Sequence, residues 1–367
     1  MLVMAGIVSG SVTAFFLFDV AEAIDLARLQ RDLGGGSSAR LSLKPTTPAY
    51  VQYRQPPFTI EGHVVDMPDT DGFNARFKAF DYGVISVALT RSLSGTWDEW
   101  LDYGLACHEN AALGQNAERF ARALVARIHA AIARPRDEFL AEDYLVFAVT
   151  GTADAATADA LIEARGGTIA QLLRGERSVL SAQERDEVLR HRISYFADDL
   201  VIPTWSSAFI RDTESGAVAA LEIIEFANSQ LLEFRYYDRL LDAEMERIYP
   251  QLQRTGWLYN WLARRYARAA RQVHSLFIDV NELTDRTENA LKIVGDVYAA
   301  RVFGLVAARL GLIEWKGSVQ EKLKTLDDIY RFAVEQTSMA RGEFLEIIVV
   351  LILVLELVLL MTGGMRP

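Results

Sequence analysis

The stretch NARFKAFDYGVISVALT, residues 74–90, decides the character of the first half of the chain. Two strand-like runs, 74–80 and 83–90, flank the short segment Asp81-Tyr82-Gly83. Asp and Gly between two runs rich in aromatic and β-branched residues are typical of a tight turn that joins antiparallel strands. The sequence therefore predicts a β-hairpin here.

On the N-terminal side of this hairpin, we expect a buried strand over residues 12–18 and an amphipathic helix over 21–33. Residues 1–18 carry no charge, so a targeting segment is the alternative. A secretory signal needs a basic start, however, and the first basic residue is Arg28. The strand is therefore the preferred interpretation. Proline-marked strands are also expected over 49–53 and 58–65.

Strands and helices alternate irregularly from the hairpin to about residue 212, which predicts an α+β domain over residues 1–212. The Ser181 side chain is the expected N-cap of a helix, with Glu184 three residues later completing the pattern. The helices are expected over 97–105, 117–133, 156–165 and 181–190, and the strands over 144–150, 193–196 and 200–210.

The segment 213–343 is predicted to be all-α, a helical bundle or coiled coil. Helices are expected over 217–249, 257–277 and 283–312, with breaks at Pro250 and Gly317. A later run repeats apolar side chains at the 4-3 spacing of a coiled-coil seam. We predict self-association through this seam, although a bundle within one chain fits equally well. Its residues are Val319, Leu323, Leu326 and Tyr330.

The run FLEIIVVLILVLELVLLM, residues 344–361, is predicted to be a single transmembrane helix followed by a short tail, 362–367. A helix of 18 residues spans about 27 Å, close to the hydrocarbon core. An acid near the centre, here Glu356, costs about 2.5–3.5 kcal/mol, while each large apolar residue returns about 0.3–0.6 kcal/mol. The balance favours insertion and a tail-anchored protein.

The orientation follows from basic residues that precede the run, which place the body in the cytoplasm by the positive-inside rule. Glu356 would then be an intramembrane acid, and its natural partner is the same helix in another copy. We therefore expect a homo-oligomer with membrane lipid around it. The basic residues upstream are Lys322, Lys324, Arg331 and Arg341.

Composition limits the classes of function. A net charge of −11 and a pI of about 5.1 argue against a general nucleic-acid binder, which needs a basic face. The lone cysteine, Cys107, excludes an internal disulfide, and its neighbour His108 lacks metal-ligand spacing. No metal or cofactor is predicted.

Two groups of polar residues are candidates for chemistry. Asp198 and Asp199 are adjacent, so on a strand their side chains would face opposite ways, and a turn or strand-edge charge is the better interpretation. The polar residues of the first long helix, Glu222, Glu225, Asn228, Gln230 and Glu233, are interpreted as a solvated helix face. We predict no catalytic residues, and an enzyme is the less favoured class.

The most distinctive local feature is a basic and aromatic segment. Arg264, Arg268 and Arg271 share one helix face. Arginine mixed with tryptophan suits anionic lipid headgroups, or RNA through phosphate pairing and base stacking. Pairing with acids of neighbouring helices is the alternative. The candidate contact residues are Arg264, Arg265, Arg268, Arg271, Trp257 and Trp261.

The chain resembles the "required for meiotic nuclear division" family of unknown function, as a bacterial member. The likeness rests on FKAFDYGVISVAL (77–89), on YFADDLVIPTWSSAFIRD (195–212) with ALEIIEFANSQLLEFRYYDRLL (220–241), and on RGEFLEIIVVLILVLELVLLM (341–361). The resemblance implies an N-terminal α+β domain, a helical segment, a C-terminal membrane span and homo-oligomers. In mitochondrial relatives it implies support of organellar translation at the inner membrane.

These observations together favour a tail-anchored, self-associating membrane scaffold without catalytic activity. One alternative is a membrane-tethered factor that binds RNA or the ribosome and supports translation. The other is a membrane-bound enzyme with an acidic site at Asp198 or Asp199.

Overall fold

The structure is a computed structural model that describes residues 6–34, 57–61, 72–152, 157–252, 276–282, 284–285 and 297–363. The chain divides into two compact units. Unit 1 comprises residues 1–236 and 283–315, and unit 2 comprises residues 237–282 and 316–367. Each unit is described by itself.

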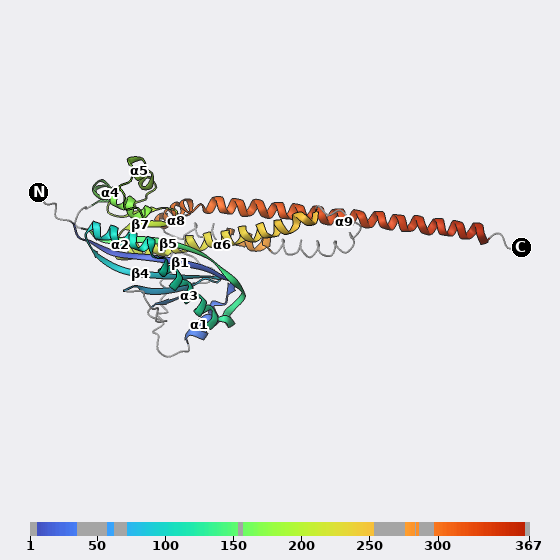
Figure 1. The fold of residues 1–367 in the computed structure, drawn as a ribbon, viewed down its shortest axis with the longest axis horizontal. Coiled ribbons are helices and arrows are strands. Elements are labelled where there is room, and N and C mark those ends of the chain that lie inside the picture. The colour runs from blue at the N-terminus through green and yellow to red at the C-terminus, as the bar shows by residue number, and fades with distance from the viewer. Residues whose placement is uncertain are drawn as a thin grey trace. The chain divides into compact units, whose positions relative to one another are not determined.

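A seven-stranded sheet organises unit 1, with the strand order β2-β3-β4-β1-β5-β7-β6 (Figure 1). All neighbouring strands are antiparallel except β5 and β7, which are parallel. β1 lies in the middle and pairs with β4 on one side and β5 on the other. The strands are β1 Val8–Ile24, β2 Phe58–Glu61, β3 Asn74–Ala79, β4 Val84–Gly95, β5 Ile132–Thr152, β6 Leu200–Pro203 and β7 Ser207–Arg211.

The predicted hairpin is confirmed. β3 and β4 pair in the register that sets Lys78 opposite Ser86. The turn places Gly83 at a positive φ of 92°, a conformation that glycine adopts at little cost. A Cβ atom there would lie 1.9 Å from the carbonyl oxygen of Ala21, so the close approach of the turn to β1 also requires glycine.

Several predicted boundaries were wrong. The helix expected over 117–133 ends at residue 127, β5 begins at Ile132 rather than at residue 144, and 193–196 forms only an isolated bridge at Ile193. β1 continues to Ile24, because its later residues still pair with β5, and α1 (Leu26–Gly34) begins five residues after the expected helix start. The single strand expected over 200–210 is two strands joined by a tight turn. The turn forms because the Thr204 hydroxyl accepts a hydrogen bond from the backbone N–H of Ser207 at 3.0 Å.

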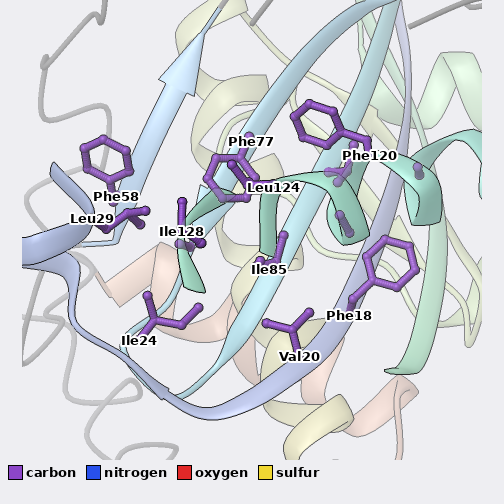
Figure 2. Packing of buried hydrophobic residues seen from close by; sticks show 14 of the residues in the cluster. Phe18, Val20, Ile24, Leu29, Phe58, Phe77, Ile85, Phe120, Leu124 and Ile128 are labelled. Carbon is purple, nitrogen blue, oxygen red and sulfur yellow. The ribbon is translucent and has the colours of Figure 1, made fainter. Parts of the chain in front are cut away.

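Helices cover one face of the sheet and bury two apolar clusters. The first cluster packs α1 and α3 against β1, β3 and β4, and Figure 2 shows Leu124 and Ile128 of α3 among residues of these strands. The second packs α2, α4 and α5 against β1, β5, β6 and β7. These helices are α2 Trp97–Glu109, α3 Ala111–Arg127, α4 Ala158–Arg174 and α5 Ala182–Arg190. The Ser181 N-cap is confirmed, since its hydroxyl accepts from Glu184 N at 3.1 Å.

The opposite face of the sheet is covered by the first half of α6 (Glu214–Leu252). An apolar stripe of this helix is buried in the structure: Ala220, Ile223, Ile224, Ala227, Leu231 and Phe234. Further along the chain, α8 (Val297–Arg309) packs against β6.

Unit 2 contains the second half of α6 and most of α9 (Leu312–Gly363). The two segments run in the same direction, because Asp238 contacts Ser318 and Lys322, and the next turn of α6, at Asp242, also contacts Lys322. Neither helix breaks where expected: α6 passes Pro250 and α9 passes Gly317.

Within the described parts of the chain, the structure contains no helix that combines the length and the apolar character needed to cross a membrane. This finding corrects the predicted fold class, the transmembrane helix over 344–361, the tail anchor, and the membrane localisation with a cytoplasmic body.

Candidate functional site

A buried charge cluster joins the sheet to α6. Arg76 and Lys78 lie two positions apart on β3, so both side chains extend from the same face. Lys78 Nζ lies 2.6 Å from Glu222 and 2.5 Å from Glu225. The two terminal nitrogens of Arg76 lie 2.8 Å and 2.9 Å from the same two carboxylates. We name these four residues the charge cluster.

The charge cluster is almost completely withdrawn from water. The side chains of Lys78, Glu222 and Glu225 are at most 1% exposed, and that of Arg76 is 22% exposed. Two cations oppose two carboxylates, so the buried charges balance. Burial alone would raise the pKa of Glu225, but the neighbouring Arg76 and Lys78 outweigh it and hold that pKa below its usual value.

The prediction of a solvated face on this helix was wrong. Glu222, Glu225, Asn228, Gln230 and Glu233 are all buried. No local sequence pattern indicates that these residues are buried, because the partners of the two glutamates lie about 145 positions away on β3. The available signal was on the strand: two cations at alternate positions of an otherwise buried hairpin need carboxylates opposite them.

Further polar contacts continue the same interface between sheet and helix. The hydroxyls of Tyr82 and Ser229 lie 2.6 Å apart, and Arg235 forms an ion pair with Glu142. Asp19 on β1 accepts a hydrogen bond from Arg136 Nε at 3.2 Å. Burial nevertheless raises the pKa of Asp19 to about 6, because the loss of hydration outweighs the effect of Arg136.

A groove of about 770 Å³ opens beside the charge cluster, and Arg76 belongs to both. Its floor is rich in hydroxyls because β1 and β4 pair Ser11 with Ser92 and Thr13 with Thr90, with alternate residues on one face. The Thr13 and Thr90 hydroxyls lie 3.0 Å apart. The arrangement offers hydrogen-bond donors and acceptors to a polar partner. The hydroxyl-bearing lining residues are Ser9, Ser11, Thr13, Thr90, Ser92, Ser94 and Thr150.

The adjacent acids Asp198 and Asp199 do not form a shared site. The Asp199 carboxylate is buried and accepts hydrogen bonds from the backbone N–H groups of Tyr195 and Phe196 at 2.8 Å and 2.7 Å. Asp198 is exposed. Asp199 therefore stabilises a turn, as preferred from the sequence, through hydrogen bonds to the backbone of nearby residues.

The neighbours Cys107 and His108 are likewise engaged in the fold. His108 Nε2 lies 2.9 Å from the carbonyl oxygen of Leu172, and burial lowers the pKa of this histidine. Burial raises the pKa of the Cys107 thiol, which disfavours the reactive thiolate. Among the described residues, no group of three or more histidines, cysteines or acids is placed to hold a metal ion.

The structure places the predicted self-association seam inside unit 2. Its four side chains are at most 2% exposed within a single chain, which is the intramolecular packing left open as the alternative. Glu356 is exposed on α9. The basic and aromatic residues Trp257, Trp261, Arg264, Arg265, Arg268 and Arg271 lie outside the described residues. The seam residues are Val319, Leu323, Leu326 and Tyr330.

The sheet, its helices and the first turn of α6 make up a domain that defines a protein family. The chain belongs to the family described as "Uncharacterized protein MJ0711, N-terminal domain", whose model matches residues 9–217. The uncharacterized protein MJ0711 of Methanocaldococcus jannaschii is 26% identical over 226 residues, which cover 61% of this chain and 66% of that relative. The matched region is thus slightly less than two thirds of the relative. No solved structure matches the chain.

Proposed function

We propose that this chain is a self-associating scaffold protein that acts by binding rather than by catalysis. One observation carries the proposal: a run of apolar side chains on α9 that is exposed on all sides of the helix. Each of these side chains is between 51% and 63% exposed. They are Val349, Val350, Leu351, Ile352, Leu353, Val354 and Leu357.

A helix that is apolar all round is unfavourable in water and needs a cover. Fully burying one such side chain is worth about 1.5–3 kcal/mol, so covering the exposed halves of three side chains in each of two copies contributes on the order of 7 kcal/mol before the costs of association. A second copy of α9 supplies a matching surface. Val350, Leu353 and Leu357 follow the 3-4 spacing with which two helices interlock.

The contacts of the reactive side chains support binding over catalysis. His108 is bonded to a backbone carbonyl, Asp199 to two backbone amides, and the charge cluster to itself. Each of these groups is used to hold the fold together. The hydroxyl-lined groove adds a second, polar surface to the same scaffold.

The test compares three full-length proteins by sedimentation velocity. The variant Val350→Asp/Leu353→Asp/Leu357→Asp places charges along one stripe of α9, while Val179→Asp changes a side chain that is 90% exposed in unit 1. We expect wild type and Val179→Asp to be oligomers and the triple variant to sediment as the 41.0 kDa monomer. A monomeric wild type, or a triple variant of unchanged size, would refute the proposal. Leu323 and Leu326 are unsuitable targets because they are buried within one chain.

We also propose that the "required for meiotic nuclear division" family is a distant relative of this one. The proposal is supported by the position of two shared stretches, 77–89 on the β3–β4 hairpin and 220–241 on α6, which carry Lys78 and both glutamates of the charge cluster. A solved structure of a member of that family tests it. Strand-borne cations facing glutamates of a long helix would agree, and a different sheet order would contradict it.

A further inference from the structure

A second cavity, of about 570 Å³, lies within unit 1 at the start of α6. The turn at Tyr195 and Phe196 forms one wall, Tyr298 of α8 forms another, and Asp199 and Asp212 contribute carboxylates. We name this space the aromatic–acidic cavity. It is distinct from the hydroxyl-lined groove, and the two linings have one residue in common, Val218.

Three aromatic rings are in contact at this cavity. The rings of Tyr195 and Phe196 meet edge to face with centroids 4.8 Å apart, and the ring of Tyr298 lies 5.4 Å from that of Tyr195. Tyr195 is 60% exposed and Phe196 is 67% exposed. The turn that carries these two rings is held by hydrogen bonds to Asp199, and the parts of the rings that are not in contact with each other are available to a ligand.

Negative charge accumulates beside these rings. Burial raises the pKa of Asp212, and the nearby charges of Asp199 and Asp198 raise it further. The Asp212 carboxylate accepts a hydrogen bond from the backbone N–H of Thr213 at 2.6 Å, just before α6 begins. This carboxylate packs against Gly216, where any side chain would clash with it. Arg301 acts electrostatically on Tyr298. The three acids Asp198, Asp199 and Asp212 outnumber this arginine.

We propose that the aromatic–acidic cavity binds a small organic cation that carries a quaternary ammonium group. Aromatic faces attract such a cation through the ring quadrupole, and nearby carboxylates offset its charge. Calcium or magnesium would use only the oxygens and gain nothing from the rings. An anion would be repelled by the acids. The rings and acids together therefore select a cation with an apolar surface.

This inference does not depend on self-association, because the cavity and the exposed part of α9 belong to different units. The test is isothermal titration of the full-length protein with tetramethylammonium chloride at constant ionic strength. tert-Butanol, a neutral molecule of similar shape, and calcium chloride are the comparison probes. We expect saturable binding of tetramethylammonium alone.

Variants locate the binding. Tyr195→Ala should weaken the affinity about two- to fivefold, the factor that one cation–π contact contributes at an exposed site, whereas Tyr195→Phe should keep it. Asp212→Asn should also weaken it. Trp205→Ala, which removes another exposed ring outside the cavity lining, is the matched control and should bind as wild type does.

Three results would overturn the proposal. The first is the absence of saturable binding to wild type. The second is equal binding of tert-butanol, which would remove the role of charge. The third is unchanged affinity in Tyr195→Ala with native circular dichroism, which would place the ligand elsewhere.

Discussion

Replacing Lys78 by methionine should destabilise unit 1 by about 3–5 kcal/mol, the usual result of removing one partner from a buried ion pair. The ammonium group lies within 2.6 Å of both Glu222 and Glu225, whose side chains are at most 1% exposed. Methionine has a similar volume, so the packing is largely kept. The cost then comes from the second carboxylate, which Arg76 alone cannot neutralise.

A second substitution separates charge from packing. In Lys78→Met/Glu225→Gln, one charge of each sign is gone and Arg76 remains paired with Glu222. The double variant should therefore recover a large part of the lost stability. The exposed pair of Arg122 and Glu118 provides the control, because both side chains are nearly half exposed and Arg122→Ala should cost no more than about 1 kcal/mol.

Urea denaturation of the full-length proteins, followed by far-ultraviolet circular dichroism, measures these differences. The reasoning is refuted if Lys78→Met costs no more than Arg122→Ala. It is also refuted if the double variant is as unstable as the single one.

Other expectations concern pH, backbone and capping. The pKa of Asp19 is about 6 in the folded protein, which is above its value in the unfolded chain. The contribution of Asp19 to stability therefore falls as the pH rises from about 4 to 6. Asp19→Asn should abolish that fall, which urea titrations at a series of pH values would measure. Gly83→Ala should lower the melting temperature well below that of Gly72→Ala, since both have positive φ but only Gly83 abuts a backbone carbonyl. Ser181→Ala should cost about 1 kcal/mol of unfolding free energy, through loss of the N-cap.

Features set by neighbouring residues were predictable from the sequence. The β3–β4 hairpin follows from residues 74–90, and the start of α5 follows from Ser181 and Glu184. The end of β1 was not predictable, because residues 19–24 remain in the strand through backbone contacts with β5 and with the turn at Asp81 and Gly83, all distant in the sequence. The strand propensity of a residue does not take such a distant partner into account.

The candidate sites were harder to predict for the same reason. The charge cluster, the groove and the aromatic–acidic cavity each combine residues from distant parts of the chain. The apolar run of α9 was visible in the sequence. An apolar pattern indicates that a helix must be buried, but it does not indicate which surface buries it. The periodic seam at Leu323 and Leu326 had the same ambiguity. In the structure these side chains are buried within one chain.

The central place of β1 has a consequence for the synthesis of the protein. Val8 pairs with Gly95 on one side and with Thr152 on the other, so this strand leaves the ribosome long before either partner exists. At roughly 5–20 residues per second, the nascent strand waits on the order of ten seconds for its second neighbour. During that time the run of phenylalanines at its centre is open to any other strand edge. Newly made chains should therefore depend on a chaperone far more than the finished domain does.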